Sequence, residues 1–146
     1  MQTTTLYDQD FYGWTQRQTE LLRLGQFGEL DVGNLIEEIE SLGRQERQEL
    51  RNRLGVLLGH LLKWHYQPET RSKSWAATIR EQRQEIQRHL KENPSLKSYF
   101  SEAIEIGYEK GLNLVDRETP LNPNQLPQTC PFSETEIFEA PVDWQP

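Results

Sequence analysis

The sequence contains a single cysteine, Cys130, and no run of about 18 apolar residues. One thiol excludes an internal disulfide and any metal site built from several thiolates. Because no long apolar run is present, we expect no membrane-spanning segment. The first residues lack a charged region followed by an apolar stretch, so we predict no signal peptide and a soluble, cytoplasmic protein.

Catalytic signatures are also missing. There is no glycine-rich phosphate-binding loop, no G-x-S-x-G nucleophile motif and no H-E-x-x-H zinc motif. None of the three histidines belongs to a Glu-x-x-His pair of the kind that holds metal ions in helical bundles. The sequence therefore predicts no catalytic residue, no metal ion and no cofactor, and it favours a protein that is not an enzyme.

The 146 residues are 34% hydrophobic and 27% charged, which is enough for one domain with a modest core. Charge is unevenly distributed along the chain. Residues 44–91 hold 11 basic and 5 acidic side chains. Residues 1–43 hold 2 basic and 8 acidic side chains, and residues 92–146 hold 3 basic and 10 acidic ones. A basic middle segment of this kind forms an anion-binding surface, or is neutralised by acidic flanks that fold back on it.

Apolar residues recur at helical spacing over four stretches, approximately 8–24, 31–66, 74–90 and 94–116. Asp8 and Asp31 are suited to cap the first two helices, and Gly25 to end the first. We predict an all-α single domain over residues 1–146. Its core is a bundle of about four main helices within residues 1–118, and a proline-rich tail, residues 119–146, packs on the bundle.

The second predicted helix is unusually long, at roughly 50 Å for some 35 residues. One face carries an apolar series that is too long for a small bundle to cover: Ile36, Ile39, Gly43, Leu50, Leu54, Leu57 and Leu61. This length favours self-association. Glu46 falls on the same face, and an inward carboxylate needs a partner, for which His65 or Arg83 are candidates.

Aromatic and arginine residues are interspersed at the end of this helix and beyond it: Trp64, Tyr66, Arg71, Trp75, Arg80 and Arg83. Such side chains can stack on bases and bind phosphates, which predicts a nucleic-acid site. They can equally pack where two helices meet, with arginine stems covering the tryptophans. A separate acidic cluster, Glu37, Glu38 and Glu40, could hold a hard cation in a metal-dependent hydrolase, or simply form a solvated helix face.

Several segments resemble one known family: YDQDFYGW at 7–14, NLIEEIESLGR at 34–44, HLLKW at 60–64 and CPF at 130–132. Together they resemble the bacterial domain-of-unknown-function family number twenty-nine, which is frequent in cyanobacteria. The resemblance covers nearly the whole chain. It implies an all-helical bacterial protein and supplies no activity, cofactor or catalytic residue.

These observations support three functions. The first is a protein-interaction module that binds a protein partner or forms a homodimer through the long helix. The second is a nucleic-acid-binding protein that uses the aromatic and arginine residues. The third is a metal-dependent hydrolase built on the acidic cluster.

Overall fold

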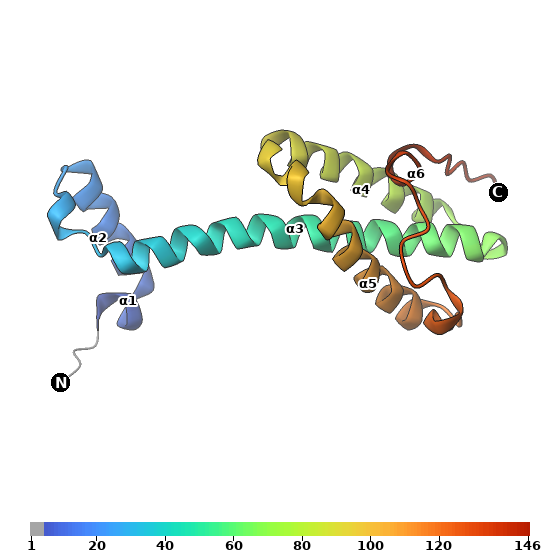
Figure 1. Cartoon of the computed structure of the whole chain (residues 1–146), viewed down its shortest axis with the longest axis horizontal. Coiled ribbons are helices and arrows are strands. Elements are labelled where there is room, and N and C mark those ends of the chain that lie inside the picture. The colour runs from blue at the N-terminus through green and yellow to red at the C-terminus, as the bar shows by residue number, and fades with distance from the viewer. Residues whose placement is uncertain (1–4) are drawn as a thin grey trace. The chain divides into compact units, whose positions relative to one another are not determined.

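The computed structural model describes residues 5–146; Met1–Thr4, which the single-domain prediction also covers, lie outside the described residues. Every regular element between residues 5 and 146 is a helix, which confirms the all-α prediction (Figure 1). The α-helices are α1 (Leu6–Gln9), α2 (Phe11–Arg23), α3 (Val32–Tyr66), α4 (Lys73–Glu92), α5 (Phe100–Glu118) and α6 (Glu134–Glu139). No helix in this part of the chain has the length and hydropathy needed to cross a bilayer.

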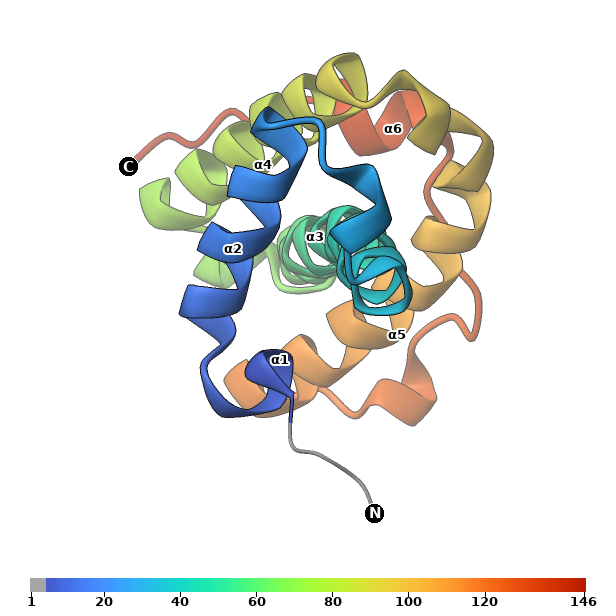
Figure 2. The same ribbon diagram turned by 90° about the vertical axis from the view of Figure 1, so that its left-hand side faces the viewer.

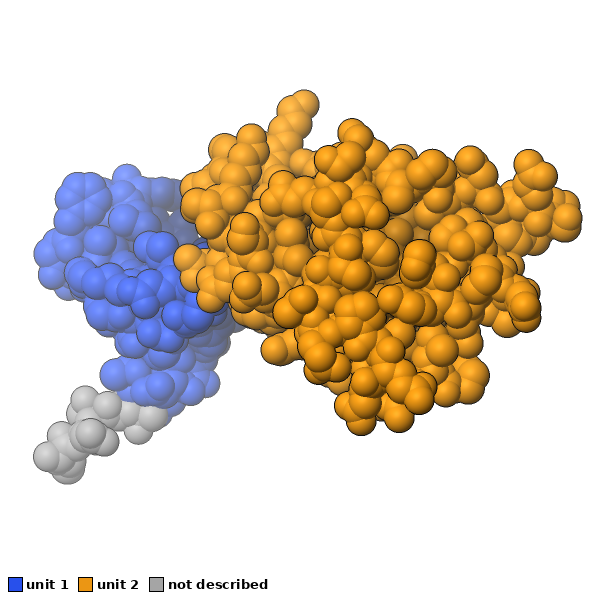
Figure 3. Space-filling model, turned by 45° about the vertical axis from the view of Figure 1, so that its right-hand side comes forward, with its two compact units in different colours: residues 1–44 blue, residues 45–146 orange. Residues whose placement is uncertain are grey.

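The chain divides into two compact units, Met1–Arg44 and Gln45–Pro146 (Figure 3). The long helix α3 contributes its first turns to the first unit and the rest to the second. Its bounds agree with the predicted helix 31–66 to within one residue. Long helical periodicity is a strong signal, so α3 is the element that the sequence predicts best.

The first unit packs α2 against the start of α3 through Trp14 and Leu21, which are 4% and 2% exposed. Polar contacts join the same segments. Trp14 Nε1 donates to Asp31 Oδ2 at 3.0 Å, and the Asp31 backbone N–H donates to Gln18 Oε1 at 2.8 Å. Asn34 Nδ2 also donates to Asp31 Oδ2 at 2.8 Å, and the hydrogen bonds from Asn34 and Trp14 lower the pKa of Asp31. Asp31 therefore joins the two helices at the residue before α3 begins.

The predicted start of the first helix, at residue 8, is wrong, because a separate short helix precedes the main one. Asp8 lies inside the four-residue helix α1, and Asp10 caps α2 by accepting from the Gly13 backbone N–H at 3.0 Å. The predicted end is confirmed, because Gly25 has a φ of 71°. Its N–H donates to Leu22 O and the next N–H to Leu21 O, a pairing that satisfies the last helical carbonyls and favours glycine.

In the second unit, α4, α5 and α6 surround the C-terminal part of α3 (Figure 2). The leucines predicted to form its buried face do so: Leu50, Leu54, Leu57 and Leu61 are at most 4% exposed. Ile79 and Ile86 of α4 are fully buried in the same core. In this core the apolar face of α3 is covered by the other helices of the second unit.

Helices α3 and α5 approach each other closely at four glycines. A Cβ on Gly59 would lie 3.2 Å from Gly111 O, and one on Gly111 would lie 2.9 Å from Gly59 N. Gly55 and Gly107 form a second close contact one turn away. A Cβ on Gly55 would lie 2.7 Å from Lys110 Cβ, and one on Gly107 would lie 2.8 Å from Leu54 Cβ. The helices can therefore pack at this distance only because these positions lack side chains.

The fourth predicted helix, 94–116, differs at its start. Residues Pro94–Tyr99 form a 3-10 helix, and the α-helix begins only at Phe100. Beyond α5 the chain lies on the second unit, with Leu126 and Ile137 buried in its core. Ser133 caps α6 in a reciprocal capping box with Glu136.

Candidate functional site

Trp64 is the most buried of the residues predicted to bind nucleic acid, with 7% of its surface exposed. The guanidinium carbon of Arg71 lies 4.8 Å from the centre of its indole ring, and Arg71 Nε donates to Trp64 O at 2.7 Å. A base could stack on this ring only after Arg71 had moved. The contacts of Arg71 with Trp64 therefore stabilise the C-terminal end of α3.

Trp75 and Tyr66 have different surroundings. Lys63 Nζ lies 4.8 Å from the centre of the half-buried Trp75 ring and 3.1 Å from Glu118 Oε1. Tyr66 is 38% exposed, and its ring packs edge-on against His65. One of the three aromatic rings thus offers a substantially open surface.

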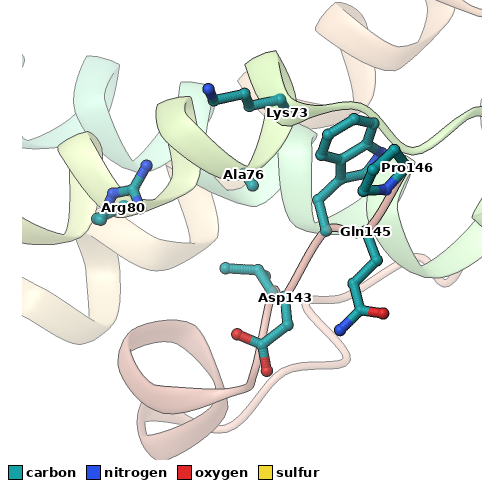
Figure 4. A pocket seen from close by; sticks show the side chains of 8 residues that line it. Lys73, Ala76, Arg80, Asp143, Gln145 and Pro146 are labelled. Carbon is teal, nitrogen blue, oxygen red and sulfur yellow. The ribbon is translucent and has the colours of Figure 1, made fainter.

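The two remaining arginines lie along α4. Arg83 Nε donates to Ile137 O at 2.7 Å and Arg83 Nη2 to Glu136 O at 3.2 Å, so Arg83 holds α6 in place, and burial lowers its pKa. Arg80 and Lys73 line a pocket of about 530 Å³ between α4 and the last residues of the chain (Figure 4). The carboxylate of Asp143 belongs to the same pocket. This charge composition does not favour a polyanion.

The partner of Glu46 is His89, and not the expected His65 or Arg83. His89 Nε2 lies 3.4 Å from Glu46 Oε2 and 2.9 Å from the backbone carbonyl oxygen of Glu46. The Glu46 side chain is 46% exposed, so it is not the inward carboxylate that its place on the apolar face suggested. His89 itself is 6% exposed. His89 belongs to no known sequence motif, so no local signal marks it as the partner of Glu46.

The acidic cluster near the start of α3 is divided among different partners. Glu37 and Glu40 both pair with Arg44, at 3.2 and 3.8 Å. Glu38 accepts a short hydrogen bond from the Tyr7 hydroxyl, which raises the Tyr7 pKa to about 12. Among the described residues, the carboxylates whose oxygens come close enough to share an ion with a third ligand are Glu46 and Glu49, beside His89. The arrangement does not favour the hydrolase.

Exposed apolar side chains are concentrated in the first unit. Ten of the twelve large hydrophobic residues that are exposed in residues 5–146 lie before residue 45. They are Leu6, Phe11, Tyr12, Leu22, Leu24, Phe27, Val32, Ile36, Ile39 and Leu42. The last four follow one another at spacings of three or four residues on α3, are 52–65% exposed, and are called the apolar stripe below.

The family model described as "Domain of unknown function DUF29" matches residues 6–142. The chain belongs to the DUF29 family. The match confirms the resemblance noted from the sequence motifs, and it includes every α-helix from α1 to α6. No curated protein and no solved structure matches the chain. What this DUF29 protein does must therefore be argued from its own residues.

Proposed function

We propose that this DUF29 protein is an interaction module that forms a homodimer through the apolar stripe of α3. The observation that carries the proposal is the exposure of Val32, Ile36, Ile39 and Leu42 on one helix. Isolated exposed hydrophobic residues are ordinary, but contiguous apolar surface on a folded protein marks an interaction site.

The stripe continues the buried face of the same helix. At 100° per residue, Val32, Ile36 and Ile39 point within about 40° of the direction of Leu50, and the fully buried Leu57 shares that direction. In the second unit this face is covered by other helices. A helix face that is apolar on both sides of Glu46 and covered only on the C-terminal side favours a further helix as its partner.

The exposed area is large enough for a dimer. Taking about 200 Å² for a fully exposed large side chain, ten half-exposed ones present on the order of 1,000 Å² in the first unit. The four residues of the apolar stripe supply on the order of 500 Å² of this area. A stable interface covers roughly 800 Å² of each partner.

A second copy of the chain also fits the charges along the stripe. The stripe begins next to Asp31 and ends next to Arg44. Antiparallel pairing about a two-fold axis places the acidic end of one stripe beside the basic end of the other. Glu37 and Glu40 are already neutralised in part by Arg44, which reduces the repulsion between two acidic first units. The proposal therefore names a second copy as the partner.

Sedimentation velocity over a range of concentrations tests the proposal. We expect the wild type to sediment as a dimer that dissociates on dilution, and Ile36→Gln/Ile39→Gln to remain a monomer with unchanged helical circular dichroism. Both side chains are exposed, so glutamine removes the apolar contact without opening the core. Tyr66→Gln is the control, because it removes exposed apolar surface from the second unit and leaves the dimer intact.

A wild type that stays monomeric at every concentration refutes self-association. The proposal also fails if Tyr66→Gln weakens the dimer as much as the double substitution does, because the interface then lies outside the stripe.

A further inference from the structure

His89 is the most buried histidine of the chain and lies between two glutamates of α3. Its Nε2 atom is 2.9 Å from Glu46 O and 3.4 Å from Glu46 Oε2, and its Nδ1 atom is 3.6 Å from Glu49 Oε2. The His89 side chain is 7% exposed, whereas those of Glu46 and Glu49 are 46% and 43% exposed. The ring is therefore fixed, and both carboxylates can adjust.

The hydrogen bond to the backbone determines which ring nitrogen is free. A carbonyl oxygen can only accept, so Nε2 carries a hydrogen and donates to Glu46 O. In the neutral ring, the lone pair of Nδ1 then faces Glu49 Oε2, which is also an acceptor. Two acceptors that face each other in this way are satisfied by a positive centre between them, either a proton on Nδ1 or a metal ion. The other ring nitrogen donates to a backbone carbonyl, as in most metal-binding histidines.

The spacing suits a transition-metal ion. Such an ion binds imidazole nitrogen and carboxylate oxygen at about 2.0–2.2 Å. With Nδ1 and Oε2 3.6 Å apart, the angle at an ion between them is roughly 120°, close to the tetrahedral value. The second oxygen of Glu49 is held by Arg53 Nε at 3.2 Å, which orients the carboxylate. Ligand atoms of Glu46, Glu49 and His89 all lie within 4.8 Å of one another.

The surroundings are acidic and open to solvent. The three residues line a pocket of about 320 Å³ together with Glu85, Glu92, Arg88 and Asn93. The four carboxylates meet two arginines, Arg88, which pairs with Glu85 at 3.0 Å, and Arg53, which pairs with Glu49 at 3.2 Å and with Glu85 at 3.9 Å. This excess of negative charge attracts cations, and the remaining ligand positions can be filled by water.

We propose that His89, Glu49 and Glu46 bind one divalent cation of the zinc class in this pocket. An imidazole nitrogen combined with carboxylate oxygens selects zinc-like ions over magnesium or calcium, which prefer oxygen ligands alone. The site joins α3 to α4, so the bound ion stabilises the packing of these two helices.

Calorimetric titration of the full chain with Zn²⁺ tests the site. We expect one Zn²⁺ per chain and affinity reduced about tenfold or more in Glu49→Gln. His89→Gln is the sharper variant, since its side-chain N–H₂ can still donate to Glu46 O while the Nδ1 ligand is gone. It should fold and lose Zn²⁺ binding. Glu109→Gln, which removes one exposed charge on α5, should bind Zn²⁺ like the wild type.

Nitrogen NMR of the imidazole rings provides a second readout. The His89 Nδ1 resonance should be that of an unprotonated nitrogen and should shift on addition of Zn²⁺, with the Nε2 proton retained. Absence of stoichiometric binding overturns the proposal, as does equal binding by Glu49→Gln and wild type. A proton on both His89 nitrogens that Zn²⁺ does not displace also overturns it, since the cluster is then an ion pair.

Discussion

Gly111→Ala is the substitution that most directly tests how α3 and α5 pack. The new Cβ would lie 2.9 Å from Gly59 N and 3.3 Å from Gly55 O, both of which are backbone atoms of α3. A flexible side chain could rotate away, but two helix backbones cannot. The helices must therefore move apart, and the contact at Gly107, one turn away, loosens with them.

The expected loss follows from two opposing effects. Alanine in place of glycine favours a helix by about 1 kcal/mol. Forcing an extra methyl group into a close-packed contact costs about 1–3 kcal/mol, and rigid neighbours place this site at the upper end. The free energy of unfolding should therefore fall by about 2 kcal/mol, which lowers the Tm by roughly 4–8 °C in a protein of this size.

Urea denaturation followed by circular dichroism measures the change. Gly43→Ala is the matched control, because a Cβ at Gly43 meets no atom within 4 Å and the residue lies inside the same helix α3. That variant should be stabilised by about 0.5–1 kcal/mol. Equal stability of Gly111→Ala and wild type would refute the close helix contact, as would a gain like that of Gly43→Ala.

Three further substitutions test other contacts. Burial lowers the pKa of His60 below its ordinary value of 6.5 while its Nδ1–H donates to Val56 O. As the pH falls, His60 is therefore protonated in the unfolded chain before it is protonated in the folded one. The free energy of unfolding that neutral His60 contributes is complete above pH 6.5 and is lost as the pH falls below that value. In His60→Asn, the free energy of unfolding, measured by denaturation at several pH values, should decline less steeply with falling pH than in the wild type. Equal slopes for the two proteins would contradict this expectation. Glu118→Ala leaves the buried Lys63 ammonium without its carboxylate and should cost about 1–2 kcal/mol in urea denaturation. Ser133→Ala removes the cap of α6 and should cost about 1 kcal/mol; an unchanged urea midpoint would contradict it.

Local signals predicted most of the helices and little of the candidate sites. Gly25 and Ser133 act as their sequence contexts indicate, because a helix end is decided by neighbouring residues. The division between α1 and α2 was missed, since Asp8 and Asp10 are equally suitable caps by sequence. His89 contacts residues 40 or more positions away in the sequence, and such contacts depend on how α4 packs on α3. Periodicity places a side chain on a face and does not identify the residue opposite it.

Glu46 shows how one residue can mark the end of a covered helix face. It follows Ile36, Ile39 and Gly43 on α3 and precedes Leu50, so by periodicity alone it belongs to one continuous apolar face. In the structure its carbonyl and carboxylate meet His89, one turn before α4 ends at Glu92. Beyond His89, α4 has one turn left and ends at Glu92. A carboxylate is tolerated at position 46 because solvent reaches it there. The charged residue within the apolar face therefore separates two functions of one helix: a bundle core after Glu46 and, in our proposal, a dimer interface before it.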